Sequence, residues 1–262
     1  MQIIDVHTHC FPDFLAEKAM QKLTENSKVK AFHDGTLKGL SASMDEAGIT
    51  KSAIQSIATR PEQTENILEW SIRIRNERFE PFISIHPEYR DYTKILKRAK
   101  DHGIKGIKVH PHYQSFFLDD EKLFPMYEAF CEYGFAVLFH AGDDIAFQGY
   151  DNASVPRLKK VIDEFPEMKI ILAHYGAYRN WQEVYDRIAG TDVFLETSFV
   201  LEEAGEEMFL KILNKHSKEK ILFGTDSPWT DQKNAVRLVS RSGIDDEAKE
   251  AIFYKNYVSL FG

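Results

Sequence analysis

The sequence is poor in cysteine and has no long apolar run, and each deficit excludes a class of protein. Only Cys10 and Cys131 occur among its 262 residues, which offers no disulfide framework and fits a reducing cytosol. No apolar run approaches the roughly 18 residues that a membrane-spanning helix needs. A basic segment followed by an apolar stretch, the mark of a signal peptide, is also missing. We therefore expect a cytoplasmic protein that does not act on membranes.

The chain also lacks an excess of positive charge. Its formal net charge at pH 7 is −8, which argues against a surface that binds nucleic acid. It has no glycine-rich turn after the first apolar run, although open nucleotide-binding sheets usually carry one there. Apolar residues make up 43% of the sequence, enough for a full core. Because no linker, charge block or repeat divides the chain, we expect one domain over residues 1–262.

What the sequence does contain is a regular alternation of strand-like and helix-like segments. The strand-like runs lie at residues 2–6, 52–57, 82–86, 104–109, 135–139, 169–173, 192–196 and 220–225. Amphipathic segments such as 62–77 and 121–132 lie between them, and residues 245–253 predict a closing helix. Strands that alternate with helices imply a parallel sheet with right-handed crossovers. The unit length of about 33 residues predicts an α/β fold, a (β/α)8 TIM barrel.

Histidines gather where these strands end. Seven of the ten histidines lie there, namely His7, His9, His86, His110, His112, His140 and His174. Active sites of such barrels are built from the carboxyl ends of the strands. On the first strand, alternation of side chains predicts that Asp5, His7 and His9 face the same side. Asp226 follows the last strand and adds a carboxylate.

This set of side chains suits a catalytic metal site. Catalytic zinc takes about three imidazole or carboxylate ligands and keeps one position for water. His7, His9 and His140 can supply the imidazoles, and Asp226 can supply a carboxylate that also accepts a proton from water. His174 is then either a further ligand or the base that orients the water.

Five segments resemble the signature blocks of the amidohydrolase superfamily, in the right order over nearly the whole chain. They are IDVHTH (4–9), GIKVHP (106–111), LFHAG (138–142), ILAHYG (171–176) and FGTDSP (223–228). The sequence is similar to the amidohydrolase-related branch, which includes aminocarboxymuconate-semialdehyde decarboxylase. The resemblance implies a metal-dependent barrel with His7, His9, His140 and Asp226 as ligands and His174 acting on water.

Lys108 leaves the number of metal ions open. It shares its parity with His110, so we expect both on the inner face of strand four. Binuclear members of the superfamily carry a carbamylated lysine on this strand, whereas a plain lysine binds a substrate carboxylate as a cation. We expect Lys108 to be an uncarbamylated cation with a catalytic role, namely binding an anionic small molecule. The site should then hold one Zn²⁺ ion, with another divalent metal as the alternative.

Two enzymatic functions fit these residues. The first is hydrolysis of an amide, lactone or similar carbonyl compound, and the second is non-oxidative decarboxylation of a small carboxylic acid. His7 favours hydrolysis, because decarboxylases of this branch often carry glutamate there, although the aminocarboxymuconate enzyme keeps both histidines. A third alternative, a metal-dependent deoxyribonuclease, is disfavoured because it would need a carboxylate ligand at the position of Lys108. A fourth, a non-catalytic binding protein, is disfavoured because such proteins tend to lose their metal ligands, and the ligand set is intact here.

Other residues carry weaker signals. Cys10 has the opposite parity to the histidines, which predicts a packing role. Asp143 and Asp144 either shape the pocket or form a solvated acidic loop. The aromatic segment 113–118 is either a wall or lid of the pocket or an interface patch, which would allow a homo-oligomer.

Overall fold

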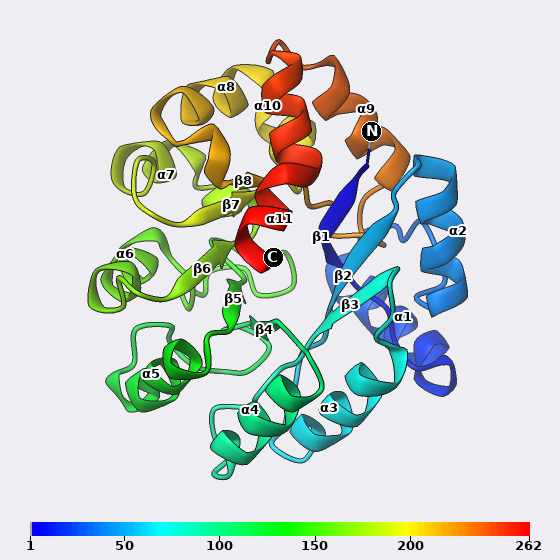
Figure 1. Cartoon of the computed structure of the whole chain (residues 1–262), viewed down its shortest axis with the longest axis vertical. Helices are drawn as coiled ribbons and strands as arrows, with labels where there is room; N and C mark the ends of the chain where they lie inside the picture. The colour runs from blue at the N-terminus through cyan, green and yellow to red at the C-terminus, as the bar shows by residue number, and fades with distance from the viewer. Residues whose placement is uncertain (1) are drawn as a thin grey trace.

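The computed structural model describes residues 2–262 and forms a ring of parallel strands surrounded by helices (Figure 1). The strands are β1 (Ile4–Thr8), β2 (Lys51–Gln55), β3 (Phe79–Phe82), β4 (Gly106–Val109), β5 (Ala136–Phe139), β6 (Lys169–Leu172), β7 (Phe194–Glu196) and β8 (Ile221–Leu222). Each one overlaps a strand region expected from the sequence, so the predicted barrel is confirmed. The boundaries differ most for β3, which begins and ends earlier than predicted.

Helices cover the outside of this ring. They are α1 (Asp13–Ser27), α2 (Leu37–Ala47), α3 (Gln63–Ile74), α4 (Tyr92–Asp101), α5 (Phe124–Tyr133), α6 (Val155–Glu164), α7 (Trp181–Arg187), α8 (Gly205–Lys215), α9 (Gln232–Arg241), α10 (Asp246–Glu250) and α11 (Asn256–Phe261). Short 3₁₀ or π turns are η1 (Glu121–Leu123), η2 (His174–Gly176), η3 (Val200–Ala204), η4 (Lys218–Lys220) and η5 (Ala251–Lys255). Across residues 2–262, none of the helices has both the length and the apolar character needed to span a bilayer.

Two sets of backbone hydrogen bonds join the strands into a closed ring. Strands β1–β3 form one ladder and β4–β8 form another. An isolated parallel bridge between Ile83 and Ile107 connects β3 to β4. Between β8 and β1, Val6 N–H donates to Phe223 O at 2.9 Å, and a bridge pairs Thr8 with Ser227. A closed sheet has no edge strand, and it brings the carboxyl ends of β1 and β8 side by side.

The opposite end of the barrel is filled with apolar side chains. Ile4, Val6 and Leu138 belong to this inner cluster, and α11 adds Tyr257 and Leu260. Figure 1 shows α11 lying across the middle of the ring. The sequence predicted a closing helix over 245–253, and the helical region extends further because these last residues bury apolar surface against the strands.

A register shift in β1 changes which side chains face inward. The pairing of β1 with β2 shifts between Asp5 and Thr8, so that Val6 packs inside the barrel and His7, the next residue, lies in the polar layer above it. Asp5 instead accepts hydrogen bonds from Thr225 and from Gln232 of α9. The prediction that Asp5 shares a face with His7 is therefore wrong, because such a bulge interrupts strict alternation.

Candidate functional site

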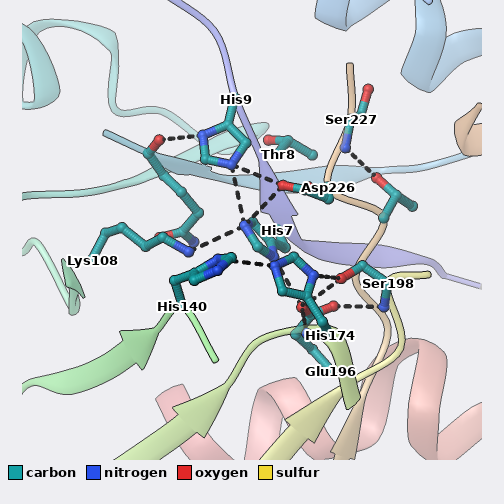
Figure 2. A network of polar contacts seen from close by, with 12 residues as sticks. His7, Thr8, His9, Lys108, His140, His174, Glu196, Ser198, Asp226 and Ser227 are labelled. Atoms are coloured by element: carbon teal, nitrogen blue, oxygen red, sulfur yellow. Dashed lines mark hydrogen bonds and ion pairs between the residues drawn. The ribbon is translucent and has the colours of Figure 1, made fainter. Parts of the chain in front are cut away.

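Three of the predicted metal ligands meet at the carboxyl ends of β1 and β8 (Figure 2). His7 Nε2 lies 3.1 Å from Asp226 Oδ1, and His9 Nε2 lies 2.9 Å from the same oxygen. The two Nε2 atoms are 3.2 Å apart. His7, His9 and Asp226 are all buried, so the barrel holds two imidazoles and one carboxylate oxygen in a compact triangle away from bulk water.

The hydrogen bonds on the far side of each ring decide what this triangle can bind. His7 Nδ1 is 2.9 Å from Glu196 Oε1, and His9 Nδ1 is 2.7 Å from the backbone carbonyl oxygen of Gln55. A carbonyl or carboxylate oxygen accepts, so both Nδ1 atoms carry a proton, and Nε2 of a neutral ring then presents a lone pair. Burial lowers the pKa of His7 well below its usual value, which keeps that imidazole neutral.

With both rings neutral, the triangle consists of three electron-pair donors in contact, and such groups repel one another unless a cation lies between them. Nitrogen and oxygen donors of this kind suit zinc and similar divalent metals. Burial raises the pKa of Asp226, but the nearby His7, His9 and His174 outweigh it, so the pKa lies below its usual value and the carboxylate is ionised. The chemistry of the donor set thus fits a divalent metal ion.

His140 and His174 stand beside this triangle. His140 follows β5 and His174 follows β6, and His174 Nε2 lies 3.1 Å from His140 Nδ1. The ring centroids of His7 and His174 are 5.3 Å apart. His140 thus contacts His174 directly, while His7, His9 and Asp226 form a group of ligand atoms within 4.8 Å of one another.

Lys108 points into the site from β4, on the inner face as predicted. Its side chain is fully buried, and Nζ lies 3.2 Å from His7 Nε2. Burial lowers the pKa of Lys108 to about 8, although the carboxylates of Asp226, Glu196 and Asp144 act in the opposite direction. Below that pH the amine is a buried cation next to the proposed metal ligands.

Asp144 comes from the loop after β5 and reaches the same region. Its Oδ2 lies 3.4 Å from His110 Nε2 and 3.7 Å from His140 Nε2, so of the two predicted alternatives it shapes the pocket. The rings of His110 and His140 are stacked, with centroids 4.0 Å apart and planes 11° apart. His110, His140 and Asp144 thus form a second group whose ligand atoms lie within 4.8 Å of one another.

Glu196 lies at a strand end, but its role in the site was not predicted from the sequence. This fully buried carboxylate, at the end of β7, accepts hydrogen bonds from His7 Nδ1, the backbone N–H of His174, and both the N–H and Oγ of Ser198. A Cβ on Gly224 would lie 2.1 Å from Glu196 Oε2. Its inward parity on β7 and the glycine just after β8 were the available signals.

Two residues of the site, His174 and Asp226, have a strained backbone. His174 and Asp226 have φ angles of 57° and 61°, a left-handed conformation that side chains other than glycine rarely adopt. The N–H of His174 donates to Glu196 at 2.7 Å, and the N–H of Asp226 donates to the carbonyl oxygen of His7 at 2.7 Å. Such strained residues cluster at active sites, where neighbouring bonds hold them.

A cavity of about 260 Å³ meets the site at Asp144 but is not lined by the predicted metal ligands. It is lined by the loop after β5, including Asp144 and Phe147, and by Tyr178 and Arg179 after β6. Tyr113 packs its ring against Phe147 with centroids 4.9 Å apart, which supports the pocket-wall interpretation of the aromatic segment.

Two further predicted residues lie elsewhere. Cys10 is buried among apolar side chains, so its packing role is confirmed. His86 accepts a hydrogen bond from the N–H of Glu88 in its own loop and belongs to none of the groups that could hold a metal among residues 2–262.

Comparison with solved structures places the fold among known barrels. An uncharacterised TIM-barrel protein from Bordetella bronchiseptica is 17% identical, with a TM-score of 0.79 over 99% of this chain and 98% of that one. A 5-carboxyvanillate decarboxylase from Novosphingobium aromaticivorans, with bound manganese, is 14% identical, with a TM-score of 0.73 over 99% and 97%. A probable 2-pyrone-4,6-dicarboxylic acid hydrolase from Acinetobacter baumannii is 14% identical, with a TM-score of 0.72 over both whole chains.

Sequence comparison gives the family. No curated protein sequence matches this chain. The model of the amidohydrolase family, in contrast, matches residues 4–262, which include every residue of the site described above. This protein therefore belongs to the amidohydrolase family.

Proposed function

We propose that this protein is a metal-dependent hydrolase that cleaves an amide, lactone or similar carbonyl compound with activated water. The observation that carries the proposal is the triangle of His7 Nε2, His9 Nε2 and Asp226 Oδ1, in which two imidazole nitrogens and a carboxylate oxygen lie within 3.2 Å of one another. The family match supports an enzyme that acts on small molecules.

His7, His9 and Asp226 would hold the ion, with His140 as the proposed fourth ligand. A divalent ion here would polarise a carbonyl group and lower the pKa of water. We propose zinc because two or three imidazoles and one carboxylate are typical zinc ligands. Manganese in one structural neighbour makes it the first alternative to test.

The protein's own residues would bind the substrate and move the protons. Asp226 has its ionised carboxylate at the triangle and can accept the proton of water and pass it to the leaving group. His174 lies 4.9 Å from His140 between ring centroids and can orient the water as a base. The Lys108 ammonium can pair with a carboxylate of the substrate, so we propose an anionic small molecule.

Decarboxylation is the second candidate, and Lys108 is the observation that favours it. A buried ammonium beside the metal ligands can hold a substrate carboxylate close to the reaction centre. Among the structural neighbours are both a decarboxylase and a hydrolase. The same residues would then hold the carboxylate that leaves as carbon dioxide.

Metal analysis followed by a substrate screen tests the proposal. Purified protein should contain about one zinc ion per chain, because the triangle offers one set of convergent ligands. The zinc-loaded protein is then screened against lactones, N-acyl compounds and aromatic carboxylates, with the His7→Ala/His9→Ala variant as the matched control. Turnover of a lactone or amide supports hydrolysis, whereas release of carbon dioxide from a carboxylate would replace it with decarboxylation.

A further inference from the structure

Ser198, two residues after the end of β7, joins His174 to Glu196. His174 Nδ1 lies 2.8 Å from Ser198 Oγ, and Ser198 Oγ lies 2.7 Å from Glu196 Oε1 (Figure 2). All three side chains are buried. None of the steps proposed above uses Ser198, yet it is the residue that bonds Nδ1 of the proposed base.

The serine hydroxyl has one proton, and the two short contacts compete for it. The carboxylate of Glu196 is surrounded by donors and accepts from each, so the contact of 2.7 Å requires Ser198 O–H as the donor. Ser198 Oγ then accepts from the N–H of His174 Nδ1. A neutral imidazole with its proton on Nδ1 has its lone pair on Nε2, which is the atom that faces His140.

We propose that Ser198 is a positioning residue that fixes His174 in the tautomer with the proton on Nδ1 and the lone pair of Nε2 directed into the site. Glu196 holds Ser198 in turn, and the same carboxylate fixes His7 with its proton on Nδ1. One buried carboxylate thus sets the tautomers of a metal ligand and of the base. The use of that lone pair in catalysis rests on the proposed function, whereas the tautomer itself does not.

The tautomer can be measured without a substrate. In zinc-loaded protein labelled with ¹⁵N-histidine, long-range ¹H–¹⁵N spectra at one fixed pH distinguish the two tautomers, and the His174→Asn variant assigns the signals. Wild-type His174 should carry its proton on Nδ1. Ser198→Ala should give a mixture of tautomers or the reverse one, and Ser198→Thr, which keeps the hydroxyl, should restore the wild-type spectrum. A proton on Nε2 in the wild type would overturn the proposal.

A matched control separates this effect from the loss of any buried hydroxyl. Ser71 in α3 is buried, and among the described residues its hydroxyl has no hydrogen-bond partner. Ser71→Ala should therefore leave the His174 signals and turnover unchanged. A change of tautomer in this control equal to that in Ser198→Ala would contradict a specific role for Ser198.

Kinetics with a substrate from the screen tests the consequence. Ser198→Ala should lower kcat by about tenfold, a typical effect of removing a partner that orients a site histidine, with KM and metal content unchanged. In the His174→Asn background the same substitution should add little, because Ser198 acts through His174. An equal loss in both backgrounds would overturn the proposal. If His174→Asn alone keeps wild-type kcat, His174 is not the base of the proposed mechanism. The tautomer measurement still tests whether Ser198 positions His174.

Discussion

The two ends of this barrel are built from the same strands but follow opposite rules. At the amino end, Val6 and Leu138 pack with Tyr257 and Leu260 in an apolar plug. At the carboxyl end, the positions a few residues further along carry polar side chains, among them His7 after Val6 and His140 after Leu138. Both ends are buried, so what separates them is chemistry and not exposure to solvent.

The two ends contribute to the free energy of folding with opposite signs. Apolar burial at the closed end contributes to folding, at about 25 cal/mol per Å² of surface removed from water. The polar end costs stability through desolvated charges, such as Lys108 and Asp226, and through the left-handed backbone of His174 and Asp226. Substitutions at the two ends should consequently separate activity from stability.

The largest effect is expected when two ligands are removed from the polar end. Changing His7 and His9 together to alanine should abolish metal binding and activity, because two of the three donors in the triangle disappear. The fold should persist, since the apolar plug is untouched. Metal analysis and circular dichroism measure the two quantities. If the double variant keeps stoichiometric zinc, the ion is held elsewhere.

Asp226→Asn should have the next largest effect. The amide fills the same space but cannot accept a proton, and acid–base groups typically contribute 10²–10⁴-fold to the rate. We expect kcat to fall by that order, with little change in substrate binding. Metal content must be measured in parallel, because Asp226 is also a proposed ligand. A variant with near wild-type kcat would show that another group moves the proton.

The closed end should respond in the opposite way. Tyr257→Ala removes a buried aromatic ring from the plug and should lower the free energy of unfolding by about 3 kcal/mol, with kcat of the folded protein unchanged. Tyr257→Phe is the matched control, since the buried hydroxyl has no hydrogen-bond partner among the described residues, and it should be neutral or stabilising. Chemical denaturation measures both. A loss of kcat without a loss of stability would break the contrast between the two ends.

The sequence was a good guide to what repeats along the chain. The eight strand regions were recognisable because apolar runs recur at regular spacing, and the histidines stood out because they recur at strand ends. Parity placed Lys108 on the inner face, where it contacts His7. These features depend on local pattern alone.

Long-range pairing explains what the sequence did not reveal. The register shift in β1 depends on how β1 pairs with β2 and cannot be read from residues 4–8 alone. The hydrogen bond from His9 to the carbonyl oxygen of Gln55 involves a backbone atom that every residue possesses. The role of Glu196 emerges only when β7 is placed between β6 and β8, next to Gly224. Ring orientations, such as that of His140 toward His174, follow from packing.

Lys108→Ala should have the smallest effect and decides between one metal ion and two. As a substrate-binding cation, Lys108 can be removed without loss of metal, and KM for an anionic substrate should rise by about tenfold, which corresponds to about 1.4 kcal/mol. A neutral analogue of the substrate is the matched control, and its KM should change little. As a carbamylated bridge, the same residue would hold a second ion. We would then expect two metal ions in the wild type and one in the variant, and short carboxylic acids should restore some activity. These results would assign Lys108 as a carbamylated bridge and not as a substrate-binding cation.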